Sequence, residues 1–301
     1  MIHSPAPIAL FVYNRLEHTK RTVIALQNNP EAKHSKLFIF SDGAKSEKDI
    51  KAVEQVRQYI HQIDGFSEVS IREQKINSGL ANSIIEGVTQ LCEEFERVIV
   101  LEDDLLVSPA FLNFMNTSLD LYENDEKIMQ VAGYMFPIDL RLDYDSLLLP
   151  YTSSWGWATW KSAWDKFDKD GVGFEKLKNS KKLRSAFDLG ASYSYYKMLS
   201  DQQKGKVESW AIRWYLSVFL NQGLVLYPKK TLVNNIGFDG TGENCIASRI
   251  DELKIEEGFN VESFPREIKV SDSYEEIKKA MIKPKLNLIS LANLFKRRFI
   301  K

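Results

Sequence analysis

The chain has 301 residues, of which 44% are hydrophobic and 27% charged, and its formal net charge is -1. This composition is typical of a globular protein with one large or two small cores, and the near-neutral charge excludes a general nucleic-acid-binding role. Two cysteines, Cys92 and Cys245, are too few for a disulfide framework or a cysteine metal cage, so we expect a reducing, cytoplasmic location.

Strand and helix patterns alternate through the first half of the chain. Apolar and β-branched runs predict strands at residues 7–13, 36–41, 69–74 and 97–101. Between them, apolar residues recur every three to four positions, as in the stripe from Leu80 to Phe95 that predicts a helix. This alternation predicts an α/β fold with a mainly parallel sheet flanked by helices.

Polar residues follow each of the four predicted strands. In chain order they are Asn14-Arg15, Asp42-Gly43, Asn77-Ser78-Gly79 and Glu102-Asp103-Asp104. The carboxyl ends of parallel strands meet at one edge of a sheet, where open α/β sheets bind their ligands. We therefore expect these four segments to converge on one ligand.

The three consecutive acids Glu102, Asp103 and Asp104 have no basic residue beside them in the sequence. Like charges so close together destabilise the fold unless a cation or hydrogen bonds compensate them. Hard oxygen ligands suit Mg²⁺ or Mn²⁺, with phosphate and water completing the coordination. The alternative is that the acids favour the dipole of a following helix, whose N-cap and first position are predicted at Ser108-Pro109.

Tryptophan is concentrated at the start of the second half, with four of the six residues between positions 151 and 164. Trp155 and Trp157 alternate as in an extended segment, whereas Trp160 and Trp164 are spaced like one face of a helix. Indole rings offer an apolar face to a sugar and an N–H donor. We expect about two of the four in the core, with Trp155 and Trp157 in the wall of a site.

Two further segments carry possible chemistry. Glu208 stands just before a predicted helix that contains Trp210, where a carboxylate either acts as a general base or compensates the helix dipole. Residues 234–244 form a polar, glycine-rich loop that is able to close over a diphosphate.

The end of the chain is basic. Residues 283–301 contain six Lys or Arg and no acid, with Leu288, Leu291, Phe295 and Phe299 at helical spacing. A basic amphipathic segment of this kind binds anionic membrane surfaces. The alternative is a terminal helix packed on the domain with its basic residues in water.

Taken together, these segments resemble the GT-A fold glycosyltransferases. The resemblance rests on residues 7–15, 40–43, 77–80, 98–104, 154–157 and 209–214 and covers about residues 5–245. The chain looks like a bacterial family 2-type transferase and is similar to the N-acetylglucosaminyltransferase I group, whose metal motif is likewise Glu-Asp-Asp. This implies a nucleotide-sugar-binding half at 1–150, an acceptor-binding and catalytic-base half at 151–260, and a C-terminal extension at 261–301.

The resemblance also implies roles for individual residues. The donor site would consist of Asn14, Arg15, Asp42, Asn77, Gly79, Glu102 and Asp103, with Asp42 accepting a hydrogen bond from the base. Asp104 would coordinate the metal, Mn²⁺ or Mg²⁺. Glu208 matches the catalytic base, which is Asp in the N-acetylglucosaminyltransferase I group. The acceptor or sugar pocket would include Trp155, Gly156, Trp157 and Trp210.

The implied function is metal-assisted, inverting transfer of a sugar from a nucleotide sugar, with a UDP-sugar expected, to a hydroxyl of a bacterial surface glycan. The acceptor would be a glycan or a lipid-linked oligosaccharide, which places the protein peripherally on the inner face of the cell membrane. One alternative is a catalytically silent glycan-binding or scaffold subunit. A second is a sugar nucleotidyltransferase, although those enzymes need a glycine-rich loop after the first strand and residues 13–17 contain no glycine.

Overall fold

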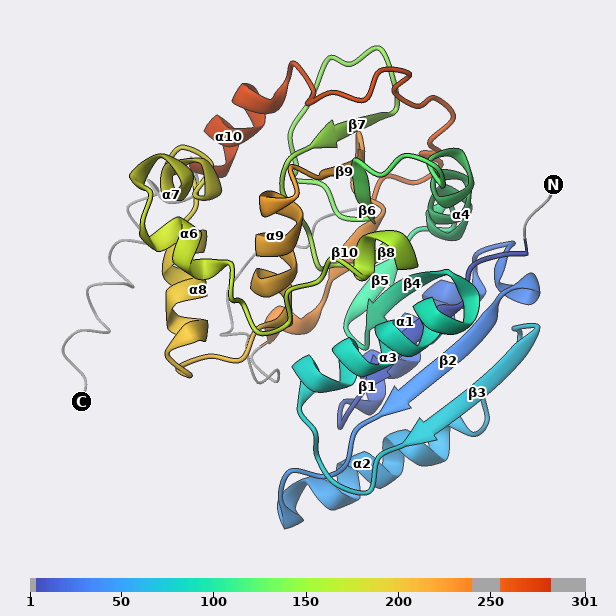
Figure 1. The fold of residues 1–301 in the computed structure, drawn as a ribbon. Coiled ribbons are helices and arrows are strands. Elements are labelled where there is room, and N and C mark those ends of the chain that lie inside the picture. Colours follow the sequence, from blue (N-terminus) through green and yellow to red (C-terminus); the bar gives the residue numbers. More distant parts are fainter. Residues whose placement is uncertain (1–3, 240–254, 283–301) are drawn as a thin grey trace.

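The computed structural model describes residues 4–239 and 255–282. Its centre is an eight-stranded sheet in the order β3-β2-β1-β4-β8-β6-β9-β7 (Figure 1). The strands are β1 (Ile8–Val12), β2 (Lys36–Ser41), β3 (Glu68–Glu73), β4 (Arg97–Glu102), β6 (Ile128–Ala132), β7 (Ser146–Leu149), β8 (Trp157–Trp160) and β9 (Leu224–Pro228). All but β8 and β7 run in the same direction, so the predicted mainly parallel sheet is confirmed.

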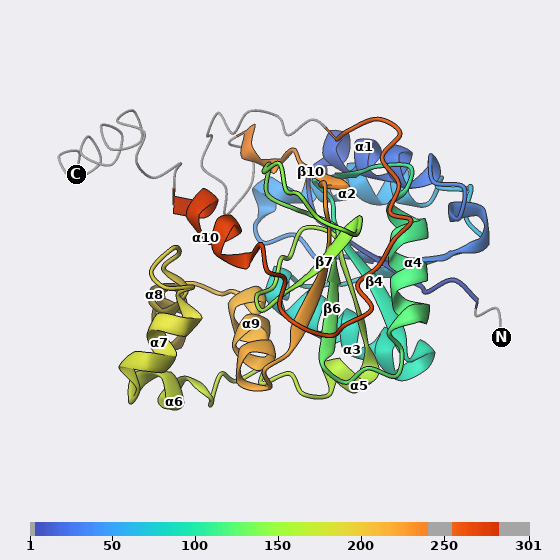
Figure 2. The same ribbon diagram turned by 90° about the horizontal axis from the view of Figure 1, so that it is seen from above.

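Helices cover both faces of this sheet (Figures 1 and 2). The helices of the described residues are α1 (Leu16–Gln27), α2 (Glu47–Ile60), α3 (Leu80–Phe95), α4 (Phe111–Leu121), α5 (Lys161–Trp164), α6 (Phe174–Lys178), α7 (Lys181–Phe187), α8 (Tyr195–Gln203), α9 (Trp210–Leu220) and α10 (Tyr274–Ile282). Of these, α6 to α8 form a group beside α9 rather than on the sheet. Strand β1 is buried on both sides: Ala9 and Phe11 pack in the core with α3 and α9, and Ile8 and Leu10 in the core with α1 and α4.

Most predicted boundaries in the first half hold to within a residue or two, and the helix at residues 80–95 holds at both ends. The helix expected from Ser108-Pro109 begins instead at Phe111. A short strand, β5 (Leu105–Val107), precedes it, and Ser108 forms the intervening turn by accepting hydrogen bonds from the N–H groups of Ala110 and Phe111. β5 pairs with β10 (Val233–Asn235) in a separate two-stranded sheet.

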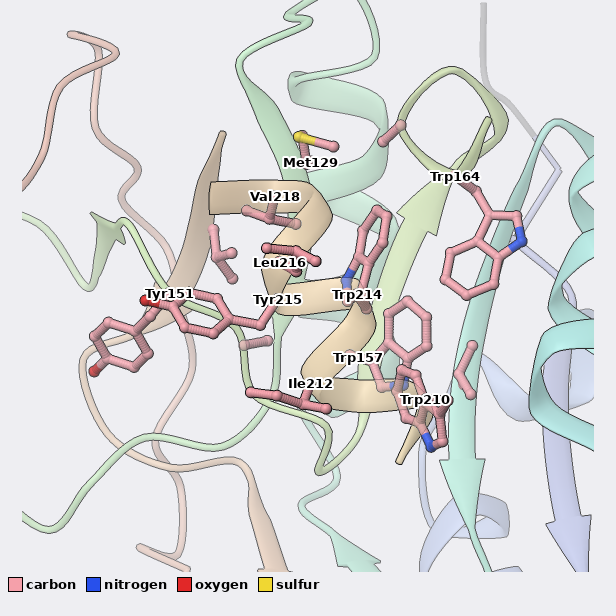
Figure 3. Close-up of a cluster of buried hydrophobic side chains, with 14 of the residues drawn as sticks. Met129, Tyr151, Trp157, Trp164, Trp210, Ile212, Trp214, Tyr215, Leu216 and Val218 are labelled. Carbon is pink, nitrogen blue, oxygen red and sulfur yellow. The ribbon is translucent and has the colours of Figure 1, made fainter. Parts of the chain in front are cut away.

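The aromatic cluster of the second half is core (Figure 3). Trp157 stacks on Trp210 with their ring centroids 5.1 Å apart, and Trp164 lies 5.0 Å from Trp214. Trp160 ends β8 rather than beginning a helix, and its indole N–H donates to the carbonyl of Leu119. Three of the four clustered tryptophans are therefore buried, one more than expected.

The chain crosses from α9 back to the edge of the sheet through β9, β10 and a 3₁₀ turn at Gly237–Asp239. Residues 255–273 run along the β7 edge, where the N–H of Ser271 donates to the carbonyl of Leu148, and lead to α10. Within the described ranges, no helix combines the length and apolar character that spanning a membrane requires. The predicted membrane-binding tail at 283–301 and part of the glycine-rich loop, 240–244, lie outside the described residues, as does Cys245.

Candidate functional site

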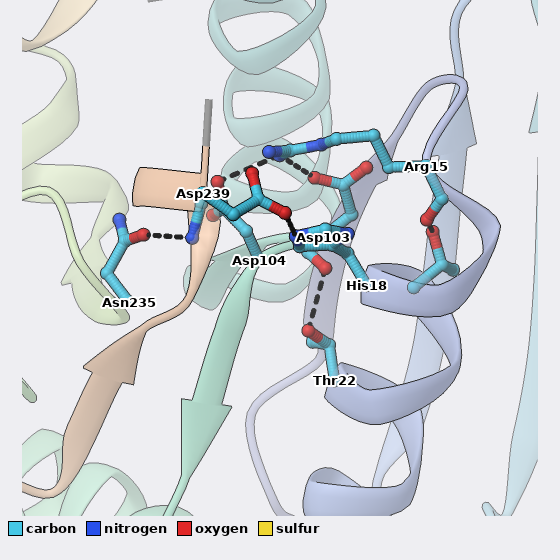
Figure 4. Close-up of polar contacts among 9 residues, drawn as sticks. Arg15, His18, Thr22, Asp103, Asp104, Asn235 and Asp239 are labelled. Atoms are coloured by element: carbon cyan, nitrogen blue, oxygen red, sulfur yellow. Dashed lines mark hydrogen bonds and ion pairs between the residues drawn. The ribbon is translucent and has the colours of Figure 1, made fainter. Parts of the chain in front are cut away.

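Two of the four predicted strand-end segments meet through Arg15 (Figure 4). Arg15 follows β1, and its Nη2 donates to Asp104 Oδ2 at 2.8 Å and also to Asp103 Oδ1. The two aspartates turn the chain between β4 and β5, and they are buried, with 5% and 6% exposure. Because β1 and β4 are parallel neighbours, residues far apart in the sequence share one edge of the sheet.

A second contact ties this cluster to helix α1. The hydroxyl of Thr22 donates a hydrogen bond to the carbonyl of Asp103 at 2.8 Å. The acid turn is therefore fixed through both its backbone and its carboxylates.

The other two segments meet at Asp42. Its Oδ1 accepts from the backbone N–H of Gly43 and Ser78, and its Oδ2 accepts from the N–H of Gly79, all at 2.8–2.9 Å. The Asn77 side chain donates to the carbonyl of Gly43 in the same junction. Asp42 thus joins the end of β2 to the loop before α3, and the expected contact of its carboxylate with a nucleotide base stays a prediction.

The electrostatics of the acid cluster follow from burial and from Arg15. Burial raises the pKa of Asp103 to about 6 even though the Arg15 guanidinium opposes that shift. Burial, with repulsion from Asp104 and Asp103, raises the pKa of Glu102 to about 8. Burial disfavours the charged form of Arg15, but the two aspartates outweigh it and raise the Arg15 pKa above its ordinary value. Arg15 is therefore a permanent cation in the site.

The returning chain after β10 closes over Asp104. The N–H of Ile236 donates to the carbonyl of Asp104, and Gly237 packs against its side chain. A Cβ on Gly237 would stand 2.1 Å from Asp104 Oδ2, so a larger residue here would displace the Asp104 carboxylate. The first part of the predicted glycine-rich loop therefore lies at the acid cluster, and its glycine is explained by close approach rather than by flexibility.

Two buried polar atoms in this cluster, Asp104 Oδ1 and Arg15 Nη1, have no hydrogen-bond partner among residues 4–239 and 255–282. Buried groups of this kind cost stability unless a ligand satisfies them. One is an anionic oxygen suited to a hard cation, and the other is a donor suited to a phosphate oxygen. The described residues contain no grouping of three or more His, Cys, Asp or Glu able to hold a metal alone, so a cation here would take most of its ligands from substrate and water.

Glu208 and Trp155 come to this edge from the second half of the chain. Glu208 is exposed and precedes α9, whose N-cap Ser209 accepts a hydrogen bond from the N–H of Ile212. Oε2 of Glu208 lies 3.6 Å from the position that a Cβ on Gly79 would occupy. Trp155 is partly exposed and contacts Phe238 with ring centroids 5.5 Å apart.

The expected roles of Trp157 and Trp210 as pocket residues are wrong. Both side chains are buried in the core, with 1% and 5% exposure, and they stack on each other. Gly156 separates Trp155 from Trp157 with a φ of +62°, so the simple alternation of an extended strand is interrupted and the two rings diverge. Gly156 is itself buried against Phe111 and Val233, where it allows close packing.

The first part of the chain is similar to a known protein family. Residues 1–136 match the model of the GNT-I family. The first half of the chain is GNT-I-like. The predicted resemblance to the N-acetylglucosaminyltransferase I group is thereby confirmed. Arg15, Asp42 and the aspartates and loop residues that they contact after β2, β3 and β4 all lie in this GNT-I-like region.

A curated relative extends the similarity beyond that region. The Arabidopsis thaliana alpha-1,3-mannosyl-glycoprotein 2-beta-N-acetylglucosaminyltransferase is 25% identical over 172 residues, which is 54% of this chain. The chain spans 38% of the length of that relative.

Solved structures that match part of the chain include two complexes with sugar nucleotides. The mannosyltransferase PcManGT from Pyrobaculum calidifontis, with GDP-Man and Mn²⁺, is 12% identical with a TM-score of 0.39, covering 73% of this chain and 74% of its own. S. aureus TarS 1–349 with UDP-GlcNAc is 11% identical with a TM-score of 0.38, covering 75% and 57%.

Sequence reasoning missed two residues near the acid cluster and Trp155, namely His18 and Tyr134. His18 Nε2 lies 3.1 Å from Asp239 Oδ2, linking α1 to the turn after β10. Tyr134 packs edge-on against Trp155 with ring centroids 4.5 Å apart. The sequence does place His18 about one helical turn after Arg15, which is the signal that could have identified it. Its partner Asp239, however, lies more than 200 residues away in the sequence.

Proposed function

We propose that this chain is a glycosyltransferase that moves a sugar from a nucleotide-sugar donor to a hydroxyl of a glycan acceptor. The observation that carries the proposal is the cluster of the partly buried Arg15 with the buried Asp103 and Asp104, in which one carboxylate oxygen and one guanidinium nitrogen have no partner among the described residues. Such a pair suits a diphosphate and its counter-cation. The cluster lies in the GNT-I-like region, and the Arabidopsis thaliana relative is named as an N-acetylglucosaminyltransferase.

The donor we propose is a UDP-sugar, which the loops that follow β1, β2, β3 and β4 would hold. Arg15 Nη1 would donate to a diphosphate oxygen, and Asp103 would keep the guanidinium in place. The nucleotide part of the donor would lie beside Asn14, Asp42, Asn77 and Gly79. Glu102, at the end of β4, lies at the same edge of the sheet. Asp104 Oδ1 would hold Mn²⁺ or Mg²⁺, which when bound would neutralise charge on the departing diphosphate.

Glu208 is the general base in this proposal. Its carboxylate takes the proton from the acceptor hydroxyl as that oxygen forms a bond to the anomeric carbon. The bond from the anomeric carbon to the diphosphate oxygen breaks on the opposite face, so the product has inverted configuration. Trp155, with Tyr134 and Phe238 packed around it, would form an apolar wall for the sugar ring.

The acceptor we propose is a bacterial surface glycan or its lipid-linked precursor, which makes this a step of polysaccharide biosynthesis. The basic residues of 283–301 would bring the protein to the inner face of the membrane, where a lipid-linked acceptor is anchored.

The test begins with calorimetric titration of nucleoside diphosphates and sugar nucleotides, each with Mn²⁺ and with chelator. We expect one uridine compound to bind, and Asp104→Asn to remove the metal-dependent part of that binding. Binding of no compound would favour the silent scaffold instead, and unchanged metal dependence in Asp104→Asn would overturn the metal assignment.

Turnover then tests the base. Glu208→Gln should lower kcat by about a hundred-fold or more while donor affinity stays nearly unchanged, because the substitution removes a proton acceptor and keeps the shape. Glu54→Gln, an exposed change on α2, is the matched control and should retain turnover. If Glu208→Gln keeps its kcat, or loses donor binding in equal measure, Glu208 is not the base.

A further inference from the structure

Residues of α7 and α10 line a basic hollow. Both helices lie away from the strand ends of the proposed active site (Figure 1). It has a volume of about 560 Å³ and is open to solvent. Its lining residues are Lys181, Lys182, Ser185, Ala186, Gly190 and Lys278. We call this surface the α7–α10 face.

Charge is unevenly distributed around this face. The whole chain is nearly neutral, but residues 174–206 contain eight Lys or Arg and three Asp or Glu. The acids are already engaged: Glu175 pairs with Lys178, Asp201 with Lys197, and the carboxylate of Asp188 accepts from the N–H of Tyr196. The excess positive charge of α6 to α8 therefore has no internal compensation on these helices.

Two of the three lysines of the hollow, Lys181 and Lys182, are available for an external anion. Lys181 and Lys182 are exposed, and neither takes part in an ion pair among the described residues. Lys278 Nζ pairs with Glu275 and lies 4.8 Å above the ring of Tyr274, which positions its side chain beside the hollow. No atom stands within 4 Å of where a Cβ would be on Gly190, so that wall admits a ligand.

Apolar side chains are exposed on the same helices and their connections. Val172, Leu183, Tyr193 and Met198 are all at least 36% exposed. Leu183 follows Lys181 and Lys182 directly on α7. Lysine interleaved with exposed apolar residues is the composition of a surface that lies in the headgroup region of a bilayer.

The sequence beyond α10 continues this character. α10 ends at Ile282, about one helical turn after Lys278, and the printed sequence goes on with Lys283 and Lys285 and then four more basic residues without an acid. The basic tail of the sequence is therefore joined to the chain at the edge of the lysine-lined hollow.

We propose that the α7–α10 face docks on a membrane that contains anionic phospholipid, with headgroup phosphates entering the hollow lined by Lys181, Lys182 and Lys278. A soluble acidic polymer would satisfy the lysines but would give no reason for the apolar residues exposed on the same helices and their connections, whereas a bilayer satisfies both. This docking stands apart from the proposed catalytic activity, since none of its residues belongs to the candidate active site.

The experiment is co-sedimentation of the full chain with vesicles of phosphatidylcholine, and with vesicles of phosphatidylcholine mixed with phosphatidylglycerol. We expect binding to the mixed vesicles only, weakened by added salt. Lys181→Glu/Lys182→Glu should lower the partition coefficient by about ten-fold or more. The matched control, Lys48→Glu/Lys51→Glu, makes the same charge change on exposed positions of α2 and should bind like the parent chain.

Three results would overturn the proposal. The first is absence of binding to mixed vesicles, and the second is equal loss of binding in both double variants, which would show an effect of net charge alone. The third is binding of a soluble acidic polysaccharide through Lys181 and Lys182 without vesicle binding, which would assign the face to a polyanionic acceptor. Far-UV circular dichroism of each variant verifies that it is folded.

Discussion

At the scale of single residues, Arg15 supplies the positive charge that the acid cluster lacks among its neighbours in the sequence. The guanidinium contacts both Asp103 and Asp104, and no other basic side chain among the described residues is recorded in contact with them. Removing it leaves two buried carboxylates without a counter-charge. The stability of the site without a cation therefore depends on Arg15.

Arg15→Met tests this dependence. In chelator at pH 8 we expect the free energy of unfolding to fall by about 3 kcal/mol, measured by urea denaturation. The pKa of Asp103 is already raised to about 6, and loss of Arg15 raises it further, so at pH 5 this carboxyl protonates and the loss becomes smaller. Asp103→Asn in the Arg15→Met background should recover part of the loss. A loss that is small at both pH values would contradict the role.

The residue types of the site were predictable from the sequence, but their partners were not. Asp103 and Asp104 stand out as acids after a buried strand, and Asp42 and Gly79 as polar residues after neighbouring strands. Nothing local shows that Arg15 reaches across from β1, because strand order decides that contact. Trp157 was expected in the wall of a site, but its side chain points into the core because Gly156 has a positive φ. The spacing of apolar residues in the sequence does not reveal such a backbone conformation.

At the scale of elements, Gln130 joins β6 of the first half to two segments of the second half. It is fully buried; its Oε1 accepts from the indole N–H of Trp214 on α9, and its Nε2 donates to the carbonyl of Ser153 at 2.6 Å. Ser153 belongs to the loop that carries Trp155, and α9 follows Glu208. One side chain therefore sets α9 and the Trp155 loop relative to the sheet.

Gln130→Met should lower the free energy of unfolding by about 2–4 kcal/mol, because it leaves a buried indole N–H and a carbonyl without partners. Met129→Leu, a volume-conserving change at the neighbouring buried position, is the control and should cost less than about 1.5 kcal/mol. Urea denaturation of both variants measures the difference. Similar losses for the two would mean that packing, rather than this hydrogen-bond bridge, explains the effect.

Element prediction succeeded where one pattern was sustained and failed where chain segments were short. α3 was predicted at both ends because its apolar stripe runs for sixteen residues. β5 and β10 have three residues each and pair with one another across the chain, so they carry no period of their own. They nevertheless bring Gly237 to Asp104, which shows why the site was only half visible in the sequence.

At the scale of the whole molecule, the two halves share one sheet and both cores. β8 of the second half lies between β4 and β6, which both come from the first half. One core contains Phe11 together with Trp214, and the other contains Leu10 together with Leu226. The similarity of residues 1–136 to one family therefore does not make them a separate folding unit.

This architecture predicts a single cooperative unfolding transition. All six tryptophans lie between residues 155 and 214, so their fluorescence reports the second half, whereas far-UV circular dichroism reports helices of both halves. The urea midpoints of the two probes should coincide, since unfolding of β8 removes the ladder on one side of β4 and leaves β4 as an edge strand paired only with β1. Val23→Ala, a buried change on α1, should lower both midpoints equally. Two separate transitions, or a fluorescence midpoint unmoved by Val23→Ala, would show that the halves unfold independently and that the shared sheet does not couple them.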